Sequence, residues 1–444
     1  MKKYLLITVT FLIGNTAIFS QNYEGMKRDS LRIDSLIKKI PVTKDTARIN
    51  YLNKLSETIL FSAYPKKTKA DRALPYVEMT YKEAKQSNYK IGIVKSLDYY
   101  EDIDGWVFQH NRINKIDNTE TIKKYEAHVN EFFEVALKLN DAKILGDAYE
   151  QKAGLFQRLG KNKEKLDAII MAAHWYKKSG NELSECTATL DISYTYLTEW
   201  EFENAFEYCK RALELAKKLA SKAGPDDISH TWLQLSLENM ADMYRIAGDF
   251  ESALSILREI RQFHLLNNTS NTWANENEFV DIYLLTNQVD SAYYYSTINK
   301  AGSLTQIYNW PRKGDLHFLR NQYDSAFYYY NKAIDTMKLR DWVANPQRAL
   351  ARSYYGKARV YEAKKQYTQA LANSRLSIFY AAKRMSIDYI LNNYNIQSRI
   401  FRQLGKNDSA YIYLKKYMSL KDSILSRQFL FKISNYKKEA EEAN

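Results

Sequence analysis

The heptapeptide GDFESAL at Gly248–Leu254 decides the fold, because variants of it recur along the chain. The variants are GKNKEKL (160–166), WEFENAF (200–206), NQVDSAY (287–293), NQYDSAF (321–327), KQYTQAL (365–371) and GKNDSAY (405–411). Their sixth residue is alanine except at Lys165, and successive sixth positions lie 40, 48, 39, 34, 44 and 40 residues apart. Similarity that returns every 20–50 residues or so indicates an array of repeated structural units.

Small and aromatic residues flank the heptapeptides at fixed spacings. A residue that is usually small comes twelve positions before the sixth residue, and an aromatic one usually follows three positions later. Residues three or four apart share a helical face. Two antiparallel helices could then cross closely at the small residues, with the aromatic ring filling the remaining space. The residues predicted to pack in this way are Ala153, Phe156, Tyr196, Ala205, Ala241, Tyr244, Ala253, Tyr283, Ala292, Gly314, Ala326, Ala333, Ala358, Tyr361, Ala370, Phe401 and Ala410.

The pattern resembles the tetratricopeptide repeat (TPR), in which small, aromatic and alanine residues occupy positions 8, 11 and 20. The resemblance implies an all-α fold, a right-handed α-α superhelical solenoid of stacked helix hairpins, similar to TPR regions of bacterial extracytoplasmic sensors. Lys165 and His317 depart from the pattern. The register gives repeats at 146–179, 186–219, 234–267, 273–306, 307–340, 351–384 and 391–424.

The remaining segments are assigned around this array of about seven repeats at 146–424. We expect an N-terminal helical segment at 21–53 and degenerate TPR-like hairpins at 54–145. Within the latter, 54–87 is a possible further repeat, with Tyr64 at position 11 and Ala73 at position 20. The amphipathic stretch 425–444 is predicted to be a helix that caps the array, because an uncapped last repeat would expose an apolar face.

The N-terminus, MKKYLLITVTFLIGNTAIFSQ, has the layout of a secretory signal peptide at 1–20. We expect cleavage near Ser20, with Ala17 as the alternative, and a retained anchor as the less favoured reading. The mature chain is then expected to be exported, periplasmic or extracellular, without a stable membrane span.

Composition narrows the class of protein further. Hydrophobic residues make up 45% of the chain and aromatic residues 14%, which excludes general disorder. The formal net charge is +13, but no Lys/Arg run is present, so no nucleic-acid partner is expected. Only Cys186 and Cys209 could form a disulfide. Their different repeat positions favour two buried free thiols, although a bridge stays open.

The sequence contains no catalytic or metal-binding motif that we could identify. Phosphate-binding loops, GxSxG elbows, HExxH and CxxC are missing, and the six histidines are scattered singly. We therefore expect neither an enzyme nor a bound cofactor or metal.

The TPR resemblance supplies a candidate binding site instead. In the family, positions 2, 5, 9 and 12 of the first helix tend to line a concave groove. Guanidinium groups there would pair with the carboxylates of an acidic partner segment or of a chain terminus. An ordinary solvated face is the alternative. The candidate residues of the last two repeats are Arg352, Tyr355, Arg359, Glu362, Asn392, Asn395, Arg399 and Arg402.

Three functions follow from these observations. The favoured one is a non-catalytic exported scaffold that binds a protein or peptide in its groove. The second is a sensory input module that acts through a partner kinase or regulator, because the ending YMSLKDSILSRQFLFKISNYKKEAEE resembles the junction at which such sensors continue. The third is an enzyme with an unrecognised site.

Overall fold

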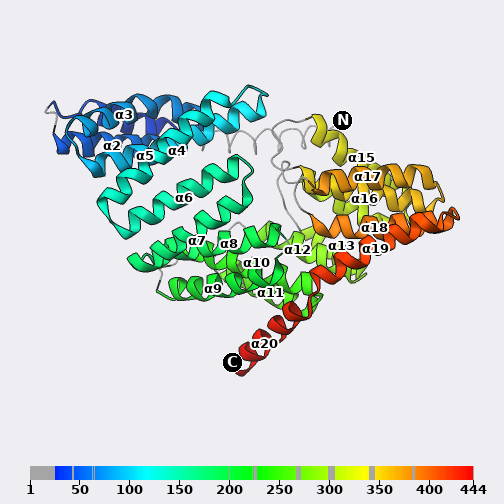
Figure 1. Ribbon diagram of the computed structural model, residues 1–444. Helices are drawn as coiled ribbons and strands as arrows, with labels where there is room; N and C mark the ends of the chain where they lie inside the picture. Colours follow the sequence, from blue (N-terminus) through cyan, green and yellow to red (C-terminus); the bar gives the residue numbers. More distant parts are fainter. Residues whose placement is uncertain are drawn as a thin grey trace, which may run out of the picture. The chain divides into compact units, whose positions relative to one another are not determined.

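The fold is all-α over the part of the chain that our computed structural model describes (Figure 1). Those residues are 26–42, 45–62, 64, 66–199, 201–222, 224, 228–266, 272–298, 306–339, 346–382 and 386–443. They contain helices and turns and no strand. The chain divides into two compact units, one ending at Asn181 and the other beginning at Glu182.

The first unit consists of antiparallel hairpins. Residues 26–37 are helical, and the later helices pair as α2 with α3, α4 with α5, and α6 with α7. The bounds are α2 (Thr46–Leu60), α3 (Lys66–Gln86), α4 (Lys90–Ile113), α5 (Thr119–Leu139), α6 (Ala142–Arg158) and α7 (Asn162–Ser179).

The second unit continues the same construction with six hairpins and one further helix. The hairpins are α8 (Glu182–Thr198) with α9 (Phe202–Ala220), α10 (Ser229–Ala247) with α11 (Phe250–Leu266), α12 (Thr272–Leu285) with α13 (Val289–Ile298), α14 (Gln306–Leu319) with α15 (Tyr323–Leu339), α16 (Gln347–Ala363) with α17 (Tyr367–Ala382), and α18 (Ile387–Gln403) with α19 (Asn407–Ile424). The last helix is α20 (Arg427–Ala443). First helices of neighbouring hairpins also touch, α8 with α10, α12 with α14, α14 with α16, and α16 with α18. We call the surface of these first helices the A layer.

The hairpins cross at small residues. The sixth-position alanines of the heptapeptides are buried, and Lys165 takes the same buried place in α7. Where position 8 is serine, its hydroxyl ties the two helices together. Ser193 Oγ donates to the Ala205 carbonyl at 2.7 Å, and Ser398 Oγ donates to the Ala410 carbonyl at 3.0 Å. The fold is therefore TPR-like, as the resemblance implied.

An aromatic pair repeats within the hairpins. The position-11 ring stacks on the ring twelve residues later, with centroids 5.2 to 5.6 Å apart. The chain has two runs of three tyrosines, at 293–295 and 328–330. The stacked pairs use Tyr295 of the first run and Tyr329 of the second, whereas Tyr293 and Tyr328 are exposed. Each run is therefore divided between packing and surface. The four pairs are Tyr196–Tyr208, Tyr283–Tyr295, His317–Tyr329 and Phe401–Tyr413.

The turn between the two helices of a hairpin explains why the first residue of the heptapeptide is often glycine or asparagine. The second heptapeptide residue donates its backbone N–H to the position-11 carbonyl, as Asp249 does to Tyr244 at 2.9 Å. This bond closes a Schellman motif, which requires a left-handed residue just before the donor. In the six heptapeptides whose first residue the structure describes, that residue has positive φ: Gly160 (70°), Gly248 (83°), Asn287 (58°), Asn321 (58°), Lys365 (57°) and Gly405 (71°).

We expect Lys365→Gly to stabilise the protein by about 0.5–1 kcal/mol, because lysine has a Cβ that disfavours the left-handed conformation. The midpoint of urea unfolding should rise accordingly. The matched control is Lys364→Gly, where φ is −81°: glycine there adds backbone entropy to the unfolded chain and removes an exposed ion pair with Asp324 at 2.8 Å, so this variant should be less stable than the wild type. A lower midpoint for Lys365→Gly would contradict the turn assignment.

The first unit differs from the predicted register. Helix α2 begins at Thr46, so Tyr64 lies in the turn after it rather than on a first helix, although Ala73 is buried in α3 as expected. Helices α4 and α5 form a regular hairpin, longer than a TPR. The division between units falls after Asn181, so the first register repeat, 146–179, belongs to the first unit.

The C-terminal helix also differs from its predicted role as a cap. Helix α20 packs on α9 and α10, near the beginning of the second unit, because its apolar residues fit a groove there. The last hairpin is left without this cover, and Tyr411, Leu414 and Met418 of α19 are exposed.

Three further sequence predictions concern the termini and cysteines. The predicted signal peptide, 1–20, lies outside the described residues. Among the helices that the structure describes, none is long and apolar enough to cross a membrane. Cys186 and Cys209 are both buried free thiols, and burial raises the pKa of Cys186 to about 11.

Candidate functional site

Charged residues follow one another along the A layer of the second unit. Position 9 of its successive first helices is Tyr194, Asp242, Asp281, Asp315, Arg359 and Arg399. The row is acidic on α10, α12 and α14 and basic on α16 and α18. Both signs of charge therefore lie on one surface, separated along it.

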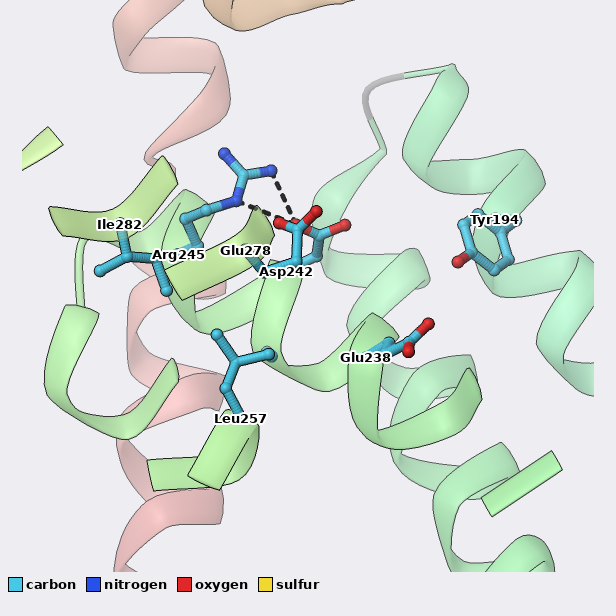
Figure 2. A pocket seen from close by; sticks show the side chains of 8 residues that line it. Tyr194, Glu238, Asp242, Arg245, Leu257, Glu278 and Ile282 are labelled. Carbon is cyan, nitrogen blue, oxygen red and sulfur yellow. Dashed lines mark hydrogen bonds and ion pairs between the residues drawn. The ribbon is translucent and has the colours of Figure 1, made fainter. Parts of the chain in front are cut away.

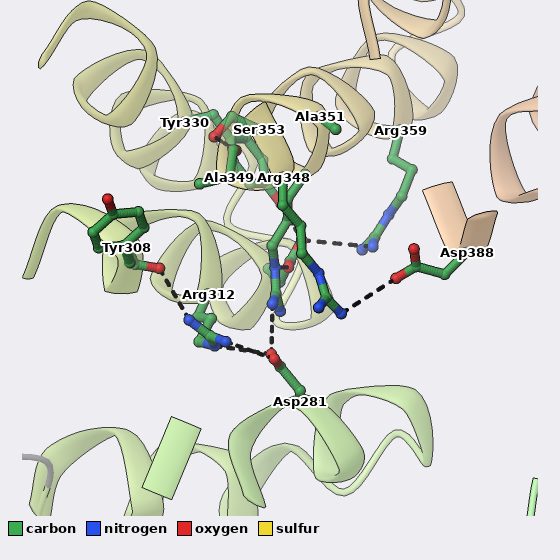
Figure 3. Close-up of polar contacts among 12 residues, drawn as sticks. Asp281, Tyr308, Arg312, Tyr330, Arg348, Ala349, Ala351, Ser353, Arg359 and Asp388 are labelled. Atoms are coloured by element: carbon green, nitrogen blue, oxygen red, sulfur yellow. Dashed lines mark hydrogen bonds and ion pairs between the residues drawn. The ribbon is translucent and has the colours of Figure 1, made fainter. Parts of the chain in front are cut away.

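Ion pairs connect neighbouring first helices at the middle of this row (Figure 3). Arg312 of α14 grips Asp281 of α12 with two nitrogens, at 2.6 and 2.9 Å. Arg352 of α16 reaches both Asp281, at 2.5 Å, and Asp315 of α14, at 2.7 Å. Burial alone would raise the pKa of Asp281, but Arg312 and Arg352 outweigh it and hold the pKa well below its usual range. Three first helices are thus joined through charged side chains.

Asp315 is the second centre of this network. It accepts a hydrogen bond from the Tyr330 hydroxyl at 2.7 Å, and Arg359 approaches it to 3.7 Å. The Arg359 guanidinium also lies 3.8 Å from the centroid of the Phe318 ring. Such stacking on an aromatic face adds a cation–π attraction and fixes the plane of the guanidinium.

The structure places the predicted anion-binding arginines in these internal contacts. Arg352 and Arg359 face the aspartates just described, and Arg399 pairs with Glu362 through two nitrogens at 2.8 and 2.9 Å. Arg352 is the most enclosed of them, with 12% of its side chain exposed. An incoming carboxylate would have to share these arginines with the chain's own acids.

The other predicted site residues are less engaged. Asn392 and Asn395 are half-buried on α18, and Arg402 is exposed in its last turn. Within the described part of the chain, Arg402 makes no ion pair. Tyr355 is half-buried, with the Arg359 guanidinium 5.4 Å from its ring centroid. At its basic end, on α18, the row therefore has Arg399, with Arg402 and two amides of the same helix beside it.

A pocket opens at the acidic end of the row (Figure 2). Its volume is about 160 Å³, and its lining comes from α8, α10, α11 and α12. Arg245 is the one cation in the lining, and it pairs with Asp242 of its own helix at 2.8 Å. Two further carboxylates remain, so the pocket has an excess of negative charge. The lining residues are Tyr194, Glu238, Ala241, Asp242, Arg245, Leu257, Glu278 and Ile282.

Glu278 is the most perturbed acid in the pocket. Burial, with added repulsion from Asp281 and Asp242, raises the pKa of Glu278 to about 7. Burial also raises the pKa of Glu238. A buried carboxylate that is costly to ionise is a frequent property of binding and catalytic sites.

We expect Glu278→Gln to stabilise the protein at pH 8 by about 1–2 kcal/mol and to have little effect at pH 5. The folded state holds the Glu278 proton more tightly than the unfolded chain does. Stability is therefore lost as pH rises from the ordinary glutamate pKa, 4.5, toward 7, and glutamine abolishes this loss. Urea midpoints at the two pH values measure it.

The control for this experiment is Glu251→Gln, at an exposed site on α11. It should change the midpoint little at either pH. Equal effects of Glu278→Gln at pH 5 and pH 8 would contradict the assignment of the raised pKa.

Sequence reasoning missed the acidic half of the row. The predicted site residues all lie in the last two repeats, so Asp281, Glu278 and Glu238 were not among them. The signal was available, because position 9 is aspartate in three consecutive repeats and arginine in the next two.

Comparisons with known proteins give only distant likenesses. No protein-family model matches the chain, and no curated protein matches it. Among solved structures, a tetratricopeptide repeat protein from Parabacteroides merdae ATCC 43184 is 16% identical, covers 64% of this chain and 98% of its own, and has a TM-score of 0.40. A Rap protein complexed with competence and sporulation factor is 12% identical (91% and 99% covered, TM-score 0.42). The apo quorum sensor NprR from B. thuringiensis is 13% identical (91% and 96% covered, TM-score 0.41).

Proposed function

We propose that the chain is a non-catalytic scaffold that binds a protein or peptide segment along the A layer of its second unit. The observation that carries this proposal is the charged row, which ends in a pocket of about 160 Å³ with unpaired carboxylate charge. Ion pairs between α12, α14 and α16 hold the row in a fixed geometry before any ligand arrives. A preorganised surface loses little entropy on binding.

The separation of acidic and basic residues along the row determines the orientation in which a ligand would bind. A lysine, arginine or N-terminal amine would enter the acidic pocket formed by α8, α10 and α12. An acidic group would lie near Arg399 and Arg402, where the sequence predicted an anion site. Complementary charge of this kind contributes specificity and speed of association more than raw affinity.

Selection from random twelve-residue peptides displayed on phage, on the immobilised full chain, tests this proposal. Selected peptides should share a basic residue near one end and an acidic residue near the other. The double variant Asp242→Asn with Glu278→Gln should lose the preference for the basic residue only. The double variant Arg399→Glu with Arg402→Glu should lose the preference for the acidic residue, with unchanged helicity by circular dichroism. A selection without charge preference, or one identical in all three proteins, would refute the proposal.

We also propose that the protein acts after export. Its N-terminal sequence supports this, with two lysines followed by an apolar stretch and small residues. N-terminal sequencing of the protein purified from the periplasm or medium of an expressing bacterium tests it. The expected first residue is Gln21, and an intact chain confined to the cytoplasm would contradict it.

A further inference from the structure

Helix α20 is held in the second unit by a short row of aromatic and aliphatic residues. Phe429 is fully buried, with its ring 5.8 Å from Phe202 and 6.4 Å from Phe206 of α9. Ile433, one turn later, is buried in the same cluster. Tyr436 meets the Phe206 ring edge-on at 5.7 Å. The spacing of 429, 433 and 436 is that of one helical face.

Charged contacts flank this apolar row on both sides. Lys432 pairs with Glu207 of α9 at 3.0 Å, and Lys437 pairs with Asp249 before α11 at 3.0 Å. A third pair has its charges reversed: the Glu439 carboxylate of α20 accepts a hydrogen bond from Lys210 Nζ of α9 at 2.9 Å. These pairs are substantially exposed, so they orient the helix more than they stabilise it.

The groove that receives α20 extends beyond what the helix fills. A pocket of about 800 Å³ lies beside Tyr436, between α9, α10 and α11. Buried apolar side chains such as Leu213, Leu237 and Met240 line it, and Lys217 and Glu259 are among the exposed residues that surround them. Of the α20 side chains that the structure describes, Tyr436 and Lys437 line this pocket, and Lys437 is charged. The groove therefore offers more apolar surface than its own helix uses.

We propose that this groove is a receptor for an amphipathic helix of a partner protein, and that α20 is its built-in competitor. The partner helix would repeat the spacing of Phe429, Ile433 and Tyr436 and add one more apolar residue a turn later. It would also present a lysine to Glu207, as α20 does. This surface is separate from the A layer and from the function proposed for it.

The competition has a simple energetic basis. A tethered helix acts at an effective concentration in the millimolar range, so a partner must bind more tightly than α20 to displace it. A fourth apolar anchor in the open part of the groove supplies that advantage, because burying a leucine side chain contributes about 1.5–3 kcal/mol. Displacement would release α20, which has exposed Leu430 and Phe431 on its other side.

The probe for this proposal is a fluorescein-labelled peptide of residues 425–444 with Ala440→Leu, which places leucine one turn after Tyr436. Its binding is measured by fluorescence polarisation on the full chain and on a variant whose α20 is released, Phe429→Ala with Ile433→Ala. We expect the released variant to bind the peptide at least tenfold more tightly than the wild type. The peptide without the leucine should bind the released variant at least tenfold more weakly than the peptide with it.

Exchanging the charges of one ion pair between protein and peptide tests whether the peptide binds in the groove. Glu207→Lys in the released variant should weaken binding, and Lys432→Glu in the peptide should restore it. The control Leu430→Ala with Phe431→Ala changes exposed residues of α20 and should leave binding at the wild-type level. Should the released variant fail to fold, it is replaced by Lys432→Glu with Lys437→Glu, which removes no core atoms and weakens α20 docking by placing like charges against Glu207 and Asp249. Equal binding by the wild-type and released chains, or failure of the charge exchange to restore binding, would overturn the proposal.

Discussion

Replacing Arg352 by alanine should destabilise the second unit by about 3 kcal/mol, as expected for breaking a buried ion network by removing one partner. Among the described residues, Arg352 is the one arginine that reaches both aspartates of the network, Asp281 at 2.5 Å and Asp315 at 2.7 Å. Its loss leaves both carboxylates desolvated and less compensated, although Arg312 still holds Asp281. The urea midpoint and the hydrogen exchange of α12, α14 and α16 amides measure this effect.

The matched control is Arg402→Ala, which removes an exposed arginine of the same surface and should change stability by less than about 0.5 kcal/mol. A second variant, Arg352→Ala with Asp315→Asn, should recover part of the loss, because it removes one of the uncompensated charges. A loss for Arg352→Ala no larger than for the control would show that the network does not hold the A layer together.

Replacing Gly356 by alanine should destabilise the same unit by about 1–3 kcal/mol through overpacking. Gly356 of α16 and Gly314 of α14 lie against the ring of the fully buried Tyr330. A Cβ on Gly356 would come within 2.1 Å of Tyr330 Cζ, and one on Gly314 within 2.4 Å of Cε1. Glycine inside a helix costs about 1 kcal/mol relative to alanine. The contact with the Tyr330 ring explains why glycine is nevertheless found at both positions.

A double-mutant cycle with Tyr330→Leu tests the contact itself. In that background the cost of Gly356→Ala should fall to near zero, since the ring that obstructs the new methyl is gone, and the coupling free energy should exceed about 1 kcal/mol. Gly224→Ala is the control, because no atom lies within 4 Å of a Cβ built there. Independent effects of the two substitutions would contradict the packing.

Local chemistry made most of the second unit predictable. The heptapeptide contains the left-handed turn residue and the alanine of the crossing, and both act within one hairpin. Ala326 is therefore buried at its crossing as expected, and Gly248 and Asn321 have the positive φ of the turn. The first unit was less predictable, because the helix starting at Thr46 lacks that local signal and its hairpin was assigned to a later register.

The sequence pattern does not predict the contacts between hairpins. The spacing places Arg352 and Arg359 on the A layer, but it does not say that neighbouring helices supply Asp281 and Asp315 to neutralise them. Nor does the amphipathic character of 425–444 say which apolar surface the helix covers. That choice depends on the fit of Phe429 between rings that precede it by more than 200 residues.

The docking of α20 also determines how the second unit folds. An open array of repeats can nucleate anywhere and grow one hairpin at a time. Here α20 completes the core beside α9, so the earliest hairpin of the unit lacks part of its interior until residues 427–443 have been synthesised. Contacts across such sequence separations slow folding. They also link the two ends of the unit, so that it unfolds as a whole rather than fraying from its C-terminus.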